Sequence, residues 1–141
     1  MEETTKASIT VEATVNAPVE KVWKFWTTPE DIIQWNSASD DWHTPTAKND
    51  LRKDGEFVYH MAAKDGSFAF DFGGVYTEVK TNELIAYTMG DGRKAKVAFT
   101  DNGNETKVVE TFEAEEVNSV DMQRSGWQAI LNNFKKYTEA N

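Results

Sequence analysis

The 141-residue chain contains no cysteine and only two histidines. The lack of cysteine excludes disulfide bonds, cysteine-ligated zinc, iron–sulfur clusters and cysteine nucleophiles. Two histidines are too few for a histidine-rich metal site, so we expect no metal and no cofactor; only an oxygen-ligated cation stays open. A Gly-x-Ser-x-Gly elbow, a glycine-rich phosphate loop and a His-Glu-x-x-His pair are also missing, and with them the chemistry that each carries.

Basic charge and long apolar runs are scarce as well. Fifteen Lys and Arg residues stand against 24 Asp and Glu, which gives a formal net charge of −9. Nucleic acids require a basic footprint, so we expect no nucleic-acid partner. No apolar run approaches the roughly 18 residues that span a bilayer. Residues 1–6 lack the basic and apolar regions of a secretory signal, so we expect a cytoplasmic protein without membrane insertion.

Leucine is rare and aromatic residues are abundant. The chain has three Leu residues but 12% Trp, Tyr and Phe. Each aromatic ring buries a large area on few rotatable bonds, so a core of rings can pack solidly or form the wall of a cavity. The length predicts one domain over residues 1–141.

Residue periodicity predicts an α+β fold. Residues 9–15 alternate apolar and polar side chains, which indicates a half-buried strand. A helix is expected from about Pro18, and a second short helix from Thr28, which would cap it, to about Trp35. A long C-terminal helix is expected after Asn118 as its N-cap, and Gly126 in its interior indicates close approach of another element or of a guest.

The segment from Trp42 to about Glu116 has the pattern of consecutive hairpin-linked strands. The expected turns are Asp54-Gly55, Asp65-Gly66, Thr81-Asn82, Asp91-Gly92 and Asn102-Gly103. Such dipeptides supply the positive φ that tight hairpins need. The pair Gly73-Gly74 within a strand predicts a bulge and a sharp bend. With the first strand this gives about seven antiparallel strands.

Several motifs resemble those of a known family. They are Ala17-Pro18-x-x-x-Val22-Trp23, Asp50-Leu51-Arg52-Lys53-Asp54-Gly55-Glu56-Phe57, Gly74-x-Tyr76-x-Glu78-Val79, Ala86-Tyr87-Thr88 and Gln123-x-x-Gly126-Trp127-x-x-Ile130-Leu131. Together they resemble the START-like SRPBCC superfamily, and within it the family named after the activator of the ninety-kilodalton heat-shock chaperone ATPase. In the second motif Asp54 stands where the family has a glycine.

This resemblance implies a helix-grip fold, in which a curved antiparallel sheet surrounds the long C-terminal helix and two short helices follow the first strand. It also implies a cavity between sheet and helix. Relatives include lipid-transfer domains, plant proteins that bind hydrophobic ligands, and polyketide cyclases. Because one fold hosts many activities, the resemblance transfers the fold better than the function.

Alternation places many aromatic side chains on one face of the sheet, and the last helix contributes others. The candidate ligand-binding residues are Trp35, Trp42, Phe57, Tyr59, Met61, Phe70, Phe72, Tyr87, Phe99, Gln123, Trp127 and Ile130. Phe68 is expected to face the same way. Such a wall could enclose an apolar guest of roughly 300 Å³ or more, whereas the alternative is that the rings fill each other's space. Trp35 and Trp42 flank the loop 36–41, which is either a lid or an anchored loop.

Glu110 and His43 are the candidate acid–base residues. Glu110 lies between Val108 and Phe112 at period two, so its carboxyl group should point inward, where burial raises a pKa. Alternatively it is solvated, or it pairs with Arg52 or Arg93. His43 follows two acidic residues and could move protons, or it could be a structural surface residue.

Two further polar residues leave alternatives open. Gln123 could reach the interior or bond the backbone near the helix start. His60 is expected to face away from the cavity, because it alternates with inward-facing neighbours.

Three functions are compatible with the sequence. The preferred one is a non-catalytic binder of a small hydrophobic or aromatic molecule such as a lipid, polyketide or flavonoid. The second is a cyclase or hydratase that uses Glu110 or His43. The third is a chaperone ATPase regulator with a chaperone partner, which is the weakest because the eukaryotic activators carry an additional N-terminal domain, for which 141 residues leave no room.

Overall fold

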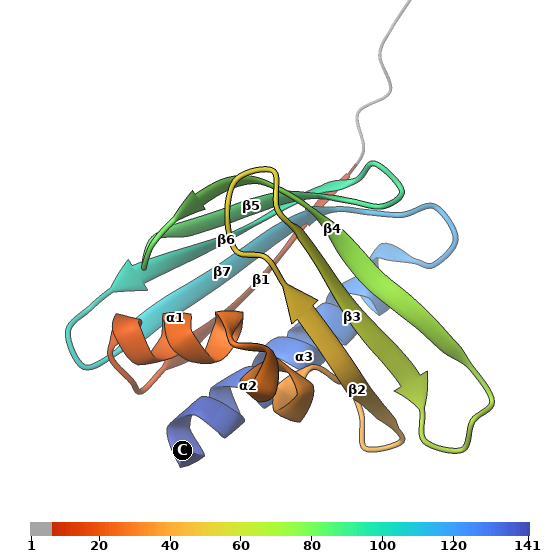
Figure 1. Cartoon of the computed structure of the whole chain (residues 1–141), viewed down its shortest axis with the longest axis horizontal. Helices are drawn as coiled ribbons and strands as arrows, with labels where there is room; N and C mark the ends of the chain where they lie inside the picture. The colour runs from red at the N-terminus through yellow and green to blue at the C-terminus, as the bar shows by residue number, and fades with distance from the viewer. Residues whose placement is uncertain (1–6) are drawn as a thin grey trace, which may run out of the picture.

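In the computed structural model, which describes residues 7–141, one strand is followed by two short helices, six further strands and a long C-terminal helix (Figure 1). Residues 1–6, in which no secretory signal was found, lie outside this range. The elements are β1 (Ser8–Val15), α1 (Val19–Thr27), α2 (Pro29–Trp35), β2 (Trp42–Asn49), β3 (Glu56–Ala63), β4 (Ala69–Lys80), β5 (Leu84–Met89), β6 (Lys94–Asp101), β7 (Thr106–Glu113) and α3 (Val120–Ala140).

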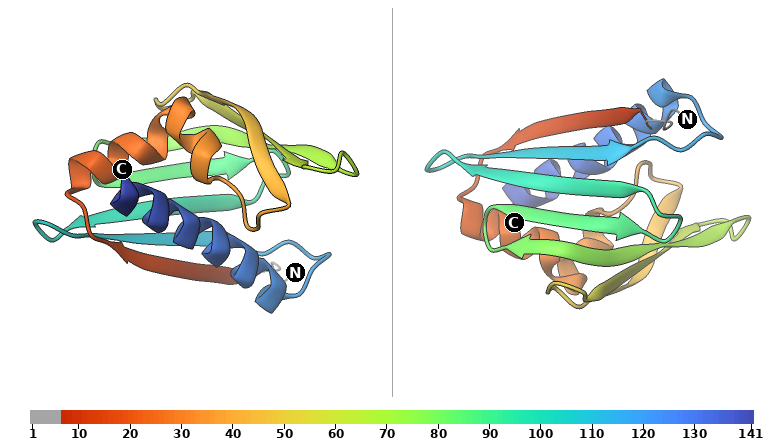
Figure 2. Two further views of the ribbon diagram at one scale, coloured as in Figure 1. Left: turned by 90° about the horizontal axis from the view of Figure 1, so that it is seen from below. Right: turned by 90° about the horizontal axis from the view of Figure 1, so that it is seen from above.

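The seven strands form one antiparallel sheet in the order β1-β7-β6-β5-β4-β3-β2. Strands β2 to β7 are consecutive neighbours, whereas β1 pairs with β7 at the far edge, so α1 and α2 carry the chain from one edge to the other. The sheet curls, and α3 lies on its inner face beside β1 with its C-terminal end near α1 (Figure 2). The predicted α+β helix-grip fold is confirmed.

The predicted turns form because their residues adopt left-handed backbone angles. Gly66, Gly92 and Gly103 have φ values of 80°, 92° and 83°, and Asn82 has 65°. Asp54, which stands where the family has a glycine, has φ 68°. Asp and Asn tolerate this region better than other non-glycine residues, so the substitution keeps the hairpin.

The helix starts differ in part from the prediction. Ser119, not Asn118, is the N-cap of α3, since its Oγ accepts a hydrogen bond from the Met122 amide at 3.1 Å. Asn118 instead donates to the Glu115 carboxylate at 2.6 Å. Thr28 does occupy the N-cap of α2, but its side chain makes no capping bond.

No other part of the protein lies close to Gly126 in the direction where a side chain would point. A Cβ atom added there would meet nothing within 4 Å. The prediction that another element approaches closely at this glycine is therefore wrong.

Gly73 and Gly74 permit close backbone contacts rather than a bulge. The register shift of β4 lies between Tyr76 and Glu78, so the bulge predicted at the two glycines is wrong by several residues. A Cβ atom on Gly73 would lie 2.5 Å from the Phe57 carbonyl oxygen, and one on Gly74 would lie 2.4 Å from the Thr88 carbonyl oxygen. The neighbouring backbones thus come too close for any side chain.

We expect Gly74→Ala to lower the free energy of unfolding by about 1–3 kcal/mol, because its methyl group would collide with backbone that cannot move aside cheaply. Gly90→Ala is the matched control, since a Cβ atom there meets nothing within 4 Å. Urea unfolding of both variants measures the difference. Equal stability of the two variants would contradict the close approach.

Candidate functional site

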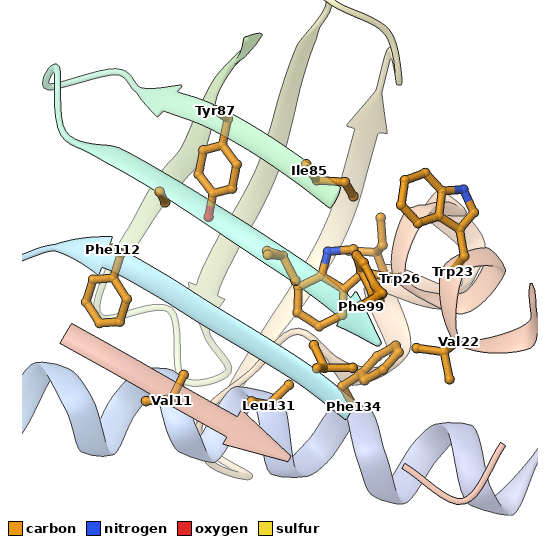
Figure 3. Close-up of a cluster of buried hydrophobic side chains, with 14 of the residues drawn as sticks. Val11, Val22, Trp23, Trp26, Ile85, Tyr87, Phe99, Phe112, Leu131 and Phe134 are labelled. Carbon is orange, nitrogen blue, oxygen red and sulfur yellow. The ribbon is translucent and has the colours of Figure 1, made fainter. Parts of the chain in front are cut away.

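The packing of side chains between α3 and the sheet differs between the two ends of the helix. Near its C-terminal end the rings of Trp26, Trp35 and Phe134 lie with centroids 4.8–5.0 Å apart. Phe99 packs against Trp23 at 5.3 Å and against Trp26 at 6.0 Å. Figure 3 shows part of this cluster, with Trp26, Phe99 and Phe134 close together. Phe99, predicted as cavity wall, lies in this packed cluster and does not line the cavity.

Toward the N-terminal half of α3, a cavity of about 230 Å³ lies between the helix and the inner face of the sheet. Its lining is mostly aromatic and apolar. The lining residues are Trp26, Trp35, Asn36, Phe57, Tyr59, Met61, Phe70, Phe72, Tyr76, Ile85, Tyr87, Arg93, Glu110, Trp127 and Ile130. Nine of the predicted wall residues are among them, together with Glu110.

The wall is built of rings that contact one another. Phe57 lies 5.2 Å from Tyr59 and 5.8 Å from Phe72, measured between centroids. From α3, Trp127 meets Phe72 edge-on at 5.9 Å and stacks on Phe112 at 3.7 Å with an interplanar angle of 12°. The two interpretations of the rings therefore both hold in part, because the rings support each other and still leave a cavity.

The cavity is smaller than expected from the sequence. Typical ligand pockets measure about 300–1,000 Å³, whereas a cavity of about 150 Å³ is enough to bind benzene. A volume of about 230 Å³ therefore fits a guest of one or two rings.

Glu110 places a carboxyl group inside this wall. On β7 the residues Val108, Glu110 and Phe112 are buried in alternation, and only 6% of Glu110 is exposed. Among residues 7–141 no side chain or amide donates a hydrogen bond to it and none forms an ion pair with it, so burial alone acts on its pKa. Burial raises the pKa of Glu110 from 4.5 to about 8. The group is therefore mostly uncharged at pH 7.

The two arginines that could have paired with Glu110 have other partners. Arg52 Nε lies 3.0 Å from the Asp50 carboxylate, and both side chains are exposed. Arg93 lines the cavity, but its Nε lies 2.7 Å from Asp91 and its Nη1 donates to the Glu113 carbonyl at 3.2 Å. The alternatives of a paired or a solvated Glu110 are wrong.

Three tyrosines accompany Glu110 in the cavity lining. Burial, followed by the nearby tyrosine hydroxyls and the Glu110 charge, raises the pKa of Tyr59 well above 10. Burial, followed by the charge of Glu110, likewise raises the pKa of Tyr87. Tyr76 donates a hydrogen bond to the Asn49 side-chain oxygen, and burial raises its pKa too. All three are neutral hydroxyl groups at pH 7.

Tyr76 lines the cavity although it was not predicted from the sequence as a wall residue. A signal for it was present, because the two-residue spacing of Phe70 and Phe72 continues through Gly74 to Tyr76, and the bulge comes only after it. Phe68 does not follow this spacing into the cavity. It precedes β4 and is 60% exposed.

Three other predicted site residues lie away from the cavity. Trp42 is half-buried at the outer end of β2, where it packs against Phe68 and Phe70 with centroids 6.0 and 5.9 Å apart. His43 is exposed on β2, the edge strand. Gln123 is buried, but its Oε1 accepts from the Glu115 amide at 2.9 Å and its Nε2 donates to the Asn118 carbonyl at 2.8 Å. The backbone alternative for Gln123 is thus confirmed.

The loop 36–41 is fastened at several points. Asn36 lines the cavity, and its Nδ2 donates to Thr44 Oγ1 at 3.2 Å, while Thr44 Oγ1 donates to the Asn36 carbonyl at 2.6 Å. From α3, Asn133 Nδ2 donates to the Ser37 carbonyl at 2.5 Å. These bonds favour the anchored loop over the lid.

Metal-binding clusters and membrane-spanning helices are both missing from the described part of the chain. Within residues 7–141, no three His, Asp or Glu side chains gather closely enough to hold a metal ion. None of the described helices has the length and hydropathy needed to cross a membrane.

His60 lies outside the cavity as expected, with its Nδ1 2.8 Å from the exposed Asp71 carboxylate.

We expect Glu110→Gln to remove a pH dependence of stability. The pKa of Glu110 in the folded state, about 8, exceeds the ordinary 4.5, so unfolding becomes easier as pH rises from 4.5 to 8. The glutamine side chain does not ionise, so the variant does not lose stability in this way as pH rises. Its free energy of unfolding, relative to the native chain, should rise by on the order of 3 kcal/mol from about pH 5 to about pH 8.

Chemical denaturation at several pH values measures this trend. Glu105→Gln is the control, because Glu105 is exposed in the β6–β7 turn and should show no comparable rise. If the free energy of unfolding of Glu110→Gln changes with pH in the same way as that of the native chain, the carboxyl group ionises with an ordinary pKa.

Comparisons with known proteins agree with this architecture. The family model described as "Activator of Hsp90 ATPase homolog 1-like protein" matches residues 16–139. A protein from Cytophaga hutchinsonii, Chr148, is 59% identical, with 95% of this chain and 93% of that chain covered and a TM-score of 0.82. The AHSA1-like protein from Aeromonas hydrophila is 45% identical over the same shares, with a TM-score of 0.89.

More distant structures share the fold alone. Protein NE0264 from Nitrosomonas europaea is 17% identical with a TM-score of 0.79, and 94% of each chain is covered. A search of the curated proteins found no match. The family match spans most of the chain and agrees with the START-like resemblance of its motifs, so the chain belongs to the family of Activator of Hsp90 ATPase homolog 1-like proteins.

Proposed function

We propose that this protein binds a small hydrophobic or aromatic molecule of one or two rings in the cavity between the sheet and α3. The observation that carries the proposal is the cavity itself, about 230 Å³ with an aromatic lining and one buried, unpaired carboxyl group. The family's fold commonly binds hydrophobic ligands, which supports the same function. No catalysis is needed to explain these features.

The energetic cost of the cavity supports a guest. The cavity opens partly to solvent, so in its empty state it leaves an aromatic lining against water and costs less than the roughly 24 cal/mol per Å³ of closed, dry cavities in protein cores. A guest that fills the void recovers much of this loss through apolar contacts.

We expect Ile130→Trp to block binding, because Ile130 lines the cavity from α3 and a larger ring would fill it. The native chain should show a saturable rise in melting temperature with at least one of benzene, indole and naphthalene; at about 100 times the Kd, binding adds about 2.7 kcal/mol. Ile130→Trp should show no such rise.

Met122→Trp is the matched control. It introduces the same ring on α3, but Met122 is 62% exposed and does not line the cavity. Its response to the three compounds should equal that of the native chain. No saturable shift with any compound in the native chain would contradict the proposed function.

A cyclase or hydratase remains the second candidate because of one observation. The pKa of Glu110, which burial raises to about 8, lies in the range that suits a general acid near neutral pH. His43 lies outside the cavity, so the partners left to Glu110 are the tyrosines of the lining, whose raised pKa values make them weak proton donors at neutral pH. Binding without turnover is therefore the better supported function.

The chaperone hypothesis depends on the family description. The matching model carries the words "Activator of Hsp90 ATPase", and this is a statement about the family's name. The cavity and Glu110 are explained by a small guest and not by a chaperone partner.

A further inference from the structure

The cavity contains a polar site within an aromatic wall. Glu110, Tyr59 and Tyr87 all line it, and Glu110 lies near enough to both tyrosines that its ionised form raises the pKa of each hydroxyl group. Figure 3 shows Tyr87 standing on the inner face of the sheet. Glu110 is 6% exposed, and within residues 7–141 nothing bonds its carboxyl group. Its carboxyl oxygens are not among the fully buried, unpartnered atoms of residues 7–141, so they face the cavity, where a guest can reach them.

The charges around Glu110 favour an uncharged guest. Arg93, the basic residue of the lining, already pairs with Asp91, so an anionic guest would find no free cation there. A cationic guest would require an ionised Glu110, and an ion pair in an apolar cavity carries a large desolvation penalty. A neutral carboxyl group in an apolar site instead donates a hydrogen bond at pH 7.

We propose that the guest presents a neutral carbonyl oxygen that accepts a hydrogen bond from the Glu110 carboxyl group, while its ring lies among the aromatic side chains. This inference rests on the proposed function and specifies the ligand class as small aryl ketones, aldehydes and similar carbonyl compounds. The Tyr87 hydroxyl in the same lining supplies a second donor for the same polar end of the guest.

The pH dependence of binding follows from the groups that face Glu110. The neighbouring strands place Val11 and Val97 opposite it, and α3 contributes Trp127 and Ile130, all of which are uncharged. The titratable and charged neighbours are Tyr59 on β3, Tyr76 on β4, Tyr87 on β5, and Arg93, paired with Asp91, in the β5–β6 turn. The three tyrosines stay neutral up to high pH because burial raises each pKa.

Glu110 is therefore the lining group whose proton is lost near pH 8, and the bond to a carbonyl guest is lost with it. Above that pH the affinity for such a guest should fall by up to tenfold per pH unit.

Three probes of similar shape test the proposal. Acetophenone has a carbonyl oxygen, isopropylbenzene has none, and 1-phenylethylamine carries a cationic amine. Their dissociation constants are measured by NMR titration of the native chain at about pH 6.5 and about pH 9.5. Because the probes differ in hydrophobicity, the quantity compared is the ratio of the isopropylbenzene Kd to the acetophenone Kd, which we expect to fall about tenfold or more at the higher pH.

Two variants separate the carboxyl group from the rest of the cavity. Glu110→Gln keeps a hydrogen-bond donor, so its ratio should not change with pH. Glu110→Leu removes the donor, so its ratio should be about tenfold lower than that of the native chain at about pH 6.5, the equivalent of one hydrogen bond. The pH series on the native chain tests the proposal even where the leucine variant does not fold.

The outcomes separate this inference from the proposed function. If isopropylbenzene and acetophenone both bind but their ratio is the same at both pH values, the carbonyl inference is wrong and the proposed function stands. Affinity for 1-phenylethylamine that exceeds both at about pH 6.5, where its amine is cationic, would assign a cationic guest and overturn the inference. If none of the three probes binds saturably, the inference and the proposed function both fail.

Discussion

A carboxyl group buried without a counter-ion controls the chemistry of this molecule. Glu110 points inward because β7 alternates strictly, and it stays unpaired because the two candidate arginines are bound to neighbouring aspartates. Its charged form is disfavoured in this environment, so its pKa rises to about 8. The cavity beside it is therefore both apolar and, at neutral pH, equipped with a hydrogen-bond donor. The burial of β7 side chains on the inner face thus accounts for both the apolar lining of the cavity and the protonated carboxyl group within it.

The cavity persists because the packing on α3 is uneven. Near the C-terminal end, Trp26, Trp35 and Phe134 fill the space between helix and sheet. Farther toward the N-terminus, Trp127 stacks on Phe112 and holds the helix at a fixed distance from the sheet. Between these two contacts the cavity of about 230 Å³ stays unfilled, with Ile130 of α3 in its lining. The short helices α1 and α2 close one end, and the anchored loop 36–41 joins them to β2.

The sequence predicts which face of a strand is buried better than it predicts where along the fold a residue lies. Period-two alternation correctly placed Glu110 and most aromatic wall residues, because each strand here has one inner face. It could not separate Phe99, which shares that face but lies beside Trp23 at the packed end. Its contacts with Trp23 and Trp26 of α1 decide this position, and they join segments far apart in sequence. Whether the lining residues bind a ligand stays a prediction.

The ionisation of Glu110 can be observed directly. A carbon-13 NMR titration of the glutamate side-chain carboxyl groups, with the Glu110 signal assigned by its loss in a Glu110 variant, reports the pKa of this residue in the folded protein. We predict a midpoint near 8, with the group protonated at neutral pH. A midpoint near 4.5 would mean that the carboxyl group is hydrated or paired in solution, and it would contradict the cavity chemistry described for this protein.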